Sequence, residues 1–214
     1  MALLKDEDKR EIRKRLAGLT GEVKLVLFTQ EHECQYCAMT REMVTEVAGL
    51  FEKIQVEVLD FVADADRAHE LGIDKVPAVA VLGERDYGIR FYGVPAGYEF
   101  ATFLEAMLDV SRGDPGLPEE WKTRLEQIDR PVHLQVMVTP TCPYCGQAVR
   151  TAHRFAMANE QIRGDMVEIS EFPQLAVKYQ VQGVPKTVIN ETHSLVGAQP
   201  EGNVLDEITK AISS

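Results

Sequence analysis

Four cysteines fall into two Cys-x-x-Cys pairs, at residues 34–37 (CQYC) and 142–145 (CPYC). Each pair directly follows a β-rich run and opens a helical pattern, so the second sulfur lies about one turn along the helix from the first. A thiolate at a helix N-terminus is stabilised and can attack a disulfide, after which its neighbour resolves the mixed disulfide. The spacing predicts two dithiol–disulfide centres, in which Cys34 and Cys142 attack and Cys37 and Cys145 resolve.

A valine–proline dipeptide follows each pair at the same distance, since Pro77 lies 43 residues after Cys34 and Pro185 lies 43 residues after Cys142. A cis proline close to the sulfurs would leave backbone groups free to pair with an extended partner chain. The alternative is a trans proline that begins an edge strand. The repeated offset favours the first interpretation, and the residues expected to contact a partner chain are Val76, Pro77, Val184 and Pro185.

A tyrosine precedes the second cysteine in both pairs, as Tyr36 and Tyr144. Its ring could shield the sulfurs and offer a surface to partners, and we count both tyrosines among the expected substrate-binding residues. The alternative, that this position tolerates many residues, stays open.

The elements around the cysteines repeat with an offset of 108 residues, so that Cys34 aligns with Cys142 and Pro77 with Pro185. Alternating and helical apolar patterns predict, in each half, a βαβ unit, a short helix, two further strands and a closing helix. This order predicts an α/β fold with two tandem units, each a mixed central sheet with helices on both faces. The expected strands are 23–29, 54–61, 78–82, 89–92, 132–139, 166–169, 186–189 and 195–196, and the expected leading helices are 5–19 and 118–128.

Residues 111–118 (SRGDPGLP) are rich in helix breakers and mark the expected boundary between the units. We therefore place the first unit at residues 1–113 and the second at residues 114–214. The linker is short, which predicts that the two units pack together.

The net charge of −11 argues against nucleic acid as a partner, because neutralising phosphates requires a basic surface. No apolar run is long enough to span a membrane, and the charged N-terminus does not resemble a secretory signal. We therefore expect a cytoplasmic protein. Cytosolic disulfides are usually transient and catalytic, which favours a working role for the cysteines.

The motifs resemble those of the thioredoxin and glutaredoxin superfamily. The tandem arrangement, with CQYC at 34–37 and CPYC at 142–145, is similar to the glutaredoxin-like protein disulfide oxidoreductases of thermophilic archaea and bacteria, in which two thioredoxin-fold units are fused. The resemblance implies an enzyme that reduces, forms or rearranges disulfides in client proteins, with peroxiredoxins among the candidate clients. It also implies an NADPH-dependent, thioredoxin-reductase-like partner, and no bound cofactor besides the redox-active disulfides Cys34–Cys37 and Cys142–Cys145.

The sequence departs from this superfamily at two kinds of position. The buried aspartate that thioredoxins carry six residues before the first cysteine is replaced by Phe28 and Val136, so that proton relay is missing. The basic residue with which glutaredoxins meet glutathione is also absent before both cysteine pairs. Glu31 and Glu33 flank the first centre instead, and like charge should disfavour the Cys34 thiolate. We therefore expect Cys142 to be the more acidic and more reactive thiol.

Two other functions fit part of the pattern. Four cysteines in two pairs could bind zinc, although 104 residues separate the pairs, far more than in compact zinc units. Alternatively, the units could be a binding scaffold with purely structural disulfides. The matching cysteines and Val-Pro dipeptides in both halves favour a redox enzyme over both alternatives.

Overall fold

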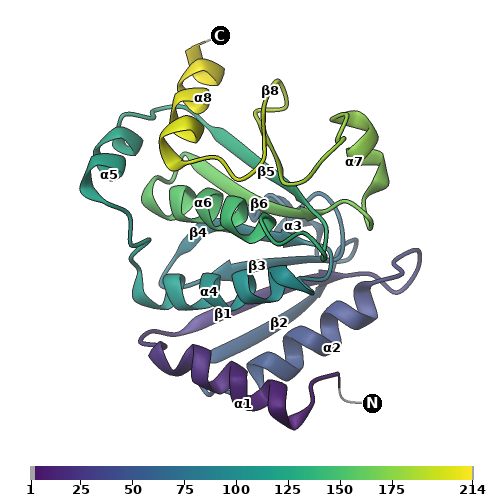
Figure 1. Cartoon of the computed structure of the whole chain (residues 1–214). Helices are drawn as coiled ribbons and strands as arrows, with labels where there is room; N and C mark the ends of the chain where they lie inside the picture. The colour runs from purple at the N-terminus through teal and green to yellow at the C-terminus, as the bar shows by residue number, and fades with distance from the viewer. Residues whose placement is uncertain (1–2, 214) are drawn as a thin grey trace.

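The computed structural model describes residues 3–213, in which eight strands form one continuous mixed sheet (Figure 1). The order across the sheet is β2-β1-β3-β4-β6-β5-β7-β8. The first four strands belong to the N-terminal half and the last four to the C-terminal half. The strands are β1 (Val23–Thr29), β2 (Ile54–Asp60), β3 (Ala78–Leu82), β4 (Asp86–Tyr92), β5 (Val132–Val138), β6 (Ile162–Glu168), β7 (Lys186–Ile189) and β8 (His193–Val196).

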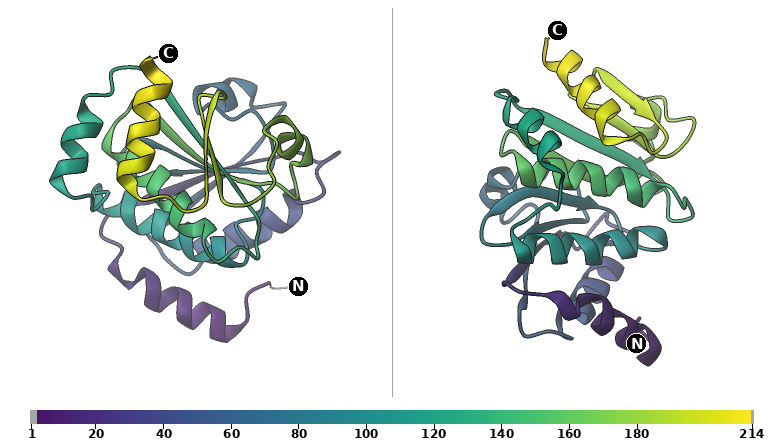
Figure 2. Two further views of the ribbon diagram at one scale, coloured as in Figure 1. Left: turned by 45° about the horizontal axis from the view of Figure 1, so that its top comes forward. Right: turned by 60° about the vertical axis from the view of Figure 1, so that its left-hand side comes forward.

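Helices cover both faces of this sheet (Figures 1 and 2). The larger core cluster joins one face of the sheet to α1, α2, α4, α5, α6 and α8, and the smaller cluster joins the other face to α3 and α7. Strands β1 and β3 are apolar on both sides, and in β1 Leu25 and Leu27 enter one cluster while Val26 and Phe28 enter the other. The helices are α1 (Asp6–Arg15), α2 (Cys37–Ala48), α3 (Ala65–Glu70), α4 (Tyr98–Arg112), α5 (Glu119–Glu126), α6 (Cys145–Ala158), α7 (Pro173–Lys178) and α8 (Glu201–Ser213).

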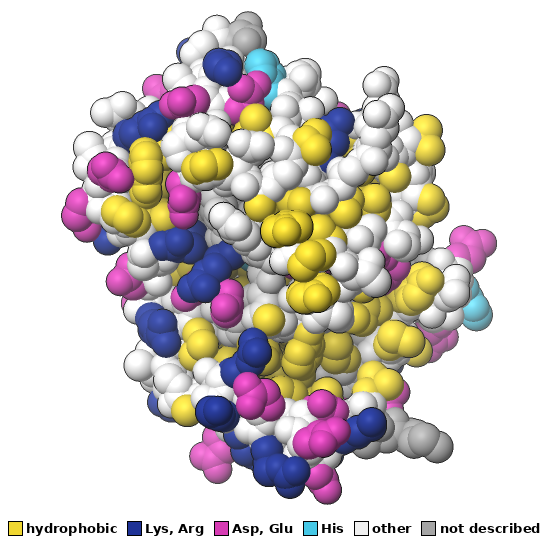
Figure 3. Space-filling model, in the orientation of Figure 1, with side chains coloured by type: hydrophobic (Ala, Val, Ile, Leu, Met, Phe, Trp, Pro, Cys, Tyr) yellow, Lys and Arg dark blue, Asp and Glu magenta, His cyan; other side chains and the backbone are white. Residues whose placement is uncertain are grey.

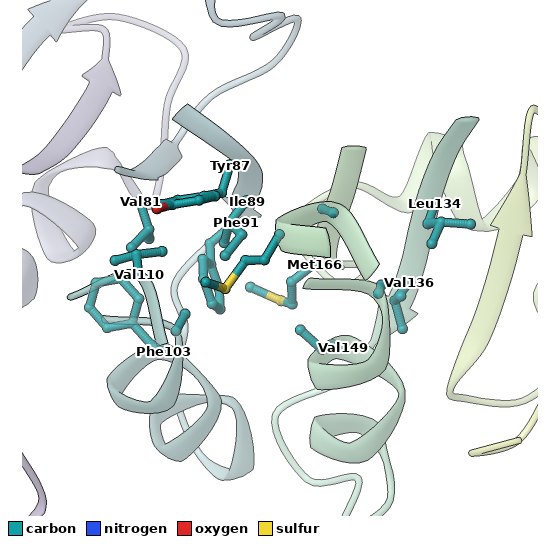
Figure 4. Close-up of a cluster of buried hydrophobic side chains, with 14 of the residues drawn as sticks. Val81, Tyr87, Ile89, Phe91, Phe103, Val110, Leu134, Val136, Val149 and Met166 are labelled. Carbon is teal, nitrogen blue, oxygen red and sulfur yellow. The ribbon is translucent and has the colours of Figure 1, made fainter. Parts of the chain in front are cut away.

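The repeated strand and helix order confirms the predicted α/β fold with two tandem units, but the two sheets are not separate. Strands β4 and β6 pair in parallel, with Phe91 opposite Met166, and this seam fuses them into one sheet. Figure 4 shows buried side chains from both sides of the seam packed into one cluster, which includes Phe103 and Val149 from α4 and α6. The seam buries two strand edges that separate units would expose.

Strand β6 begins at Ile162, four residues before the predicted start at 166. The expectation was wrong because Arg163, Gly164 and Asp165 interrupt the apolar pattern. Asp165 is fully buried in β6 and forms ion pairs with His133 on β5 and with Arg163. A buried charge that has such partners can lie within a core strand.

Residues 113–118 contain no helix or strand and connect α4 to α5. Gly113 ends α4 in the left-handed conformation, with φ at 66°. Helix α5 then packs against α6 and α8 of the C-terminal half. These contacts support the boundary at 113/114, which stays a proposal. The predicted helix at 5–19 comprises α1 and a short 3-10 turn at Leu16–Gly18.

No helix among residues 3–213 is both long and apolar enough to cross a lipid bilayer.

Candidate active site

The cysteines of each pair are joined by a disulfide, Cys34 to Cys37 and Cys142 to Cys145, with a Cα–Cα distance of 5.5 Å in both. Cys37 and Cys145 are the first residues of α2 and α6, so each helix begins at the second cysteine of its pair. The first cysteine therefore lies in the loop just ahead of the helix. This placement brings both sulfurs of a pair to the end of the helix where backbone N–H groups lack partners.

Both disulfides lie at the same end of the sheet. Strands β1 and β5 run in the same direction, because the pairings from β1 through β3, β4 and β6 to β5 contain two antiparallel steps. The loops that follow these strands carry the cysteines and lie on one side in Figure 1. The strands are four spacings apart, which corresponds to roughly 20 Å.

This separation bears on the zinc alternative, because a four-thiolate site needs all four sulfurs around one ion. Here the four cysteines form two separate disulfides. Within the part of the chain that the structure describes, no three His, Cys, Asp or Glu side chains are placed to hold a metal ion. The cysteine pairs therefore act as two separate redox-active disulfides.

The peptide bonds Val76–Pro77 and Val184–Pro185 are both cis, as the repeated offset predicted. A backbone N–H donates to each proline carbonyl, from Gly93 to Pro77 at 3.0 Å and from Gly197 to Pro185 at 2.8 Å. At the first centre, Cys34, Tyr36, Val76 and Pro77 line one cavity. At the second centre, the Cys142 Sγ lies 3.7 Å from the Val184 carbonyl oxygen. The fold thus brings each Val-Pro pair to its disulfide, while its contact with a client chain stays a prediction.

The two centres differ in exposure. Cys34 is half-buried, whereas Cys142 is only 7% exposed. The tyrosines show the opposite order, because Tyr144 is 67% exposed and Tyr36 is half-buried. A second cavity beside the first disulfide is lined by both of its cysteines together with Glu31 and Arg41. Glu31 therefore lies at the first centre, as its sequence position suggested.

Glu99 is a candidate functional residue that the sequence did not indicate. It lies in the first turn of α4, is 1% exposed, and neither of its carboxylate oxygens makes a hydrogen bond of normal geometry. Burial raises its pKa to about 7, and the nearby Thr102 hydroxyl lowers it only in part. The same turn packs against the second centre, since the Tyr98 N–H donates to the Pro140 carbonyl at 3.2 Å.

Glu171 is the second residue that the sequence did not indicate. It lies between β6 and α7 of the second unit, yet it lines the first unit's cavity together with Cys34 and Pro77. Burial raises its pKa to about 7, the backbone N–H of Val94 lowers it and Glu168 raises it further. Both acids come from the unit that does not carry the neighbouring cysteines, so no motif within one unit could reveal them.

Comparisons with known proteins agree with this geometry. Residues 132–210 match the family model described as a thioredoxin domain. The chain is 25% identical over 148 residues to an NADH dehydrogenase of Bacillus subtilis (strain 168), covering 69% of this chain and 27% of that protein. It is 20% identical over 190 residues to the F component of alkyl hydroperoxide reductase from Staphylococcus aureus, covering 88% of this chain. The chain spans about a third or less of these relatives, 27% and 34% of their lengths.

Solved structures extend the similarity to nearly the whole chain. The crystal structure of a protein disulfide oxidoreductase from Aeropyrum pernix is 29% identical with a TM-score of 0.91, and the match covers 98% of this chain and 94% of that one. The alkyl hydroperoxide reductase component AhpF from Enterococcus faecalis is 24% identical with a TM-score of 0.88, covering 96% of this chain and 99% of that one. The second similarity shows the shared fold.

Proposed function

Because the chain is a protein disulfide oxidoreductase with two thioredoxin-like units, we propose that both of its centres exchange disulfides with client proteins. The observation that carries this proposal is the pairing of each helix-opening disulfide with its own cis Val-Pro bond, built twice at one end of a single sheet. Val76, Pro77, Val184 and Pro185 would contact the extended client chain beside the sulfurs. Tyr36 and Tyr144 would cover the bound segment.

Client reduction proceeds in two steps at each centre. The thiolate of Cys34 or Cys142 attacks one client sulfur, forms a mixed disulfide and releases the other client sulfur as a thiolate. Cys37 or Cys145 then loses its proton and attacks the mixed disulfide, which releases the second client thiolate and closes the intramolecular disulfide. Two electrons pass to the client, and the same steps in reverse oxidise a client dithiol.

The second step requires an acceptor for the resolving thiol's proton. At the second centre we propose the Glu99 carboxylate, since it is buried at the helix end that packs against the Pro140 loop and its pKa is about 7. A carboxyl group with such a pKa can both accept and return a proton near neutral pH. Glu99 would thus replace the acid that the strand before the cysteines lacks at Val136.

The partner proteins belong to the same proposal. Similarity to the AhpF component of alkyl hydroperoxide reductase supports a client in peroxide reduction, namely a peroxiredoxin whose disulfide the centres would reduce. A reductase that resembles thioredoxin reductase and uses NADPH would return electrons to the two centres. We place these exchanges in the reducing cytosol, where a CxxC disulfide serves as a transient intermediate.

The proposal is tested with single-centre variants, Cys34→Ser/Cys37→Ser and Cys142→Ser/Cys145→Ser, in insulin reduction and in equilibrium redox titration. Each variant should keep measurable reductase activity and give one two-electron potential, and the variant with all four serines should be inactive. If neither single-centre variant reduces insulin although the folded chain is intact, the disulfides are structural and the scaffold alternative holds.

The expected difference between the attacking thiols stays a prediction. Ultraviolet titration of the thiolates in the two single-centre variants compares them directly, and Cys142 should ionise at the lower pH. A lower value for Cys34 would contradict the effect expected from Glu31 and Glu33.

A further inference from the structure

The cavity at the first centre is shared by the two units. It has a volume of about 320 Å³. Cys34, Tyr36 and Pro77 line it from the first unit, and Ser170 and Glu171 line it from the second. The loop that carries Ser170 and Glu171 reaches this position because β6 pairs with β4 across the seam. A client segment that reaches Cys34 through this cavity therefore meets side chains of both units.

Two hydrogen bonds hold Glu171 in place in the lining of this cavity. Its Oε1 accepts a hydrogen bond of 2.7 Å from the Val94 N–H, and its own N–H donates to the Glu168 carboxylate at 2.9 Å. Gly93, the neighbour of Val94, donates to the Pro77 carbonyl, so Glu171 is attached to the backbone beside the cis proline. Its other oxygen, Oε2, is buried and has no hydrogen-bond partner among the described residues. A buried acceptor without a partner is costly, and a donor supplied by a bound client would remove that cost.

The charge around this acceptor is negative. Glu33 lines the same cavity, and no Lys or Arg side chain from residues 3–213 does. Lys75, next to Val76 in the chain, lies over the Tyr92 ring at 3.7 Å. In Figure 3 acidic side chains stand out at the right-hand edge, where the loop from β1 to α2 lies in Figure 1. At the second centre, the position that corresponds to Glu33 is Thr141.

We propose that Glu171 is a specificity-determining residue of the first centre, where it selects client segments that carry a cationic side chain next to the reactive cysteine. The cation would donate to Glu171 Oε2 and would be further stabilised by Glu33. At the second centre Thr141 takes the place of Glu33 and the acid Glu99 is only 1% exposed, so this centre would reduce clients with little regard to charge. The inference rests on the proposed function and adds a client class to one of its two centres.

The test uses short peptides joined as symmetric disulfide dimers, with Lys, Ser or Glu beside the cysteine and otherwise the same sequence. The Cys142→Ser/Cys145→Ser protein, which retains only the first centre, is assayed for kcat/KM at pH 8, where Glu171 is ionised, with dithiothreitol as the electron source. It should prefer the Lys peptide to the Glu peptide by about tenfold at low ionic strength, and the preference should shrink in salt. The Cys34→Ser/Cys37→Ser protein should show a ratio within about twofold of one, because its centre lacks the acids that distinguish the peptides.

Glu171→Gln in the first-centre protein should remove most of the preference, since glutamine keeps an oxygen for the Val94 N–H but carries no charge. Glu160→Gln is the matched control, because it makes the same charge change at the opposite end of β6, ahead of Ile162. The inference is overturned if Glu171→Gln leaves the ratio unchanged, or if the unsubstituted first-centre protein shows no preference. The absence of a preference in the unsubstituted first-centre protein would overturn the inference even if the Glu171→Gln variant does not fold, because that measurement needs no change at residue 171. Failure of the proposed function looks different, because no peptide would then be reduced at either centre.

Discussion

Burial keeps the carboxyl of Glu99 in its neutral form up to about pH 7, and this raised pKa makes the stability of the fold depend on pH. In the unfolded chain the same group ionises near pH 4.5. The folded protein therefore binds one more proton than the unfolded chain between these values. The contribution of Glu99 to the free energy of unfolding must therefore fall as the pH rises from 4.5 to 7, and it stays constant above pH 7.

Glu99→Gln should accordingly make the protein more stable at pH 8, by up to about 3 kcal/mol, because the neutral amide has no charge to desolvate. The difference between the variant and the unsubstituted protein should vanish below pH 4.5. Urea unfolding at pH 4 and pH 8 measures this difference in the free energy of unfolding. A gain of equal size at both pH values would show that packing and not ionisation is the cause. The variant should also slow resolution at the second centre more than at the first.

Among the helices and strands, the sequence predicts the positions of those whose apolar pattern is uninterrupted. Strand β1 occupies residues 23–29 as expected, because its side chains are buried in a regular pattern on both faces. The start of β6 was not predictable, because Asp165 interrupts its apolar pattern and one partner of that buried acid, His133, comes from β5. Cis prolines were predictable from a repeated offset, whereas the acids Glu99 and Glu171 were not. Only folding brings Glu171 to the cavity at Cys34, and only folding packs the first turn of α4, which carries Glu99, against the Pro140 loop.

The start of α4 is an element on which the second centre depends. Gly97 caps this helix with φ at 61°, and a Cβ at this position would overlap the Pro140 carbonyl oxygen in the loop before Cys142. Gly97→Ala should destabilise the protein by roughly 2 kcal/mol or more and should slow the second centre while the first keeps most of its rate. Thermal unfolding and the single-centre assays measure both effects. Gly183→Ala, where nothing lies within 4 Å, is the control for stability.

At the scale of the whole molecule, a buried polar cluster ties the two units together at the seam. Asp165 is opposite Arg90 in the β4–β6 pairing and contacts His133 and Arg163. Burial by itself would raise the pKa of Asp165, but His133 and Arg163 outweigh it and lower the pKa below its usual value. Arg163 also donates to the Gly72 carbonyl of the first unit at 2.9 Å. The fusion of the sheets was not predictable, because this cluster forms between segments far apart in the sequence.

Asp165→Asn should destabilise the protein by about 3 kcal/mol, because it leaves the half-buried Arg163 guanidinium without its counter-charge. Asp206→Asn removes an exposed partner of Arg124 and should cost less than about 1 kcal/mol. Guanidinium unfolding at pH 7 compares the two. Similar losses in both variants would mean that the seam cluster contributes no more than a surface ion pair.

The common direction of β1 and β5 limits how many macromolecules the enzyme can engage at once. A stable protein–protein contact covers about 800 Å² on each side, a patch wider than the roughly 20 Å between the two disulfides. A folded client docked on one of them would therefore obstruct the other. Trapped covalent complexes of the Cys37→Ser/Cys145→Ser variant should accordingly contain one folded client per chain, whereas small peptides should load both.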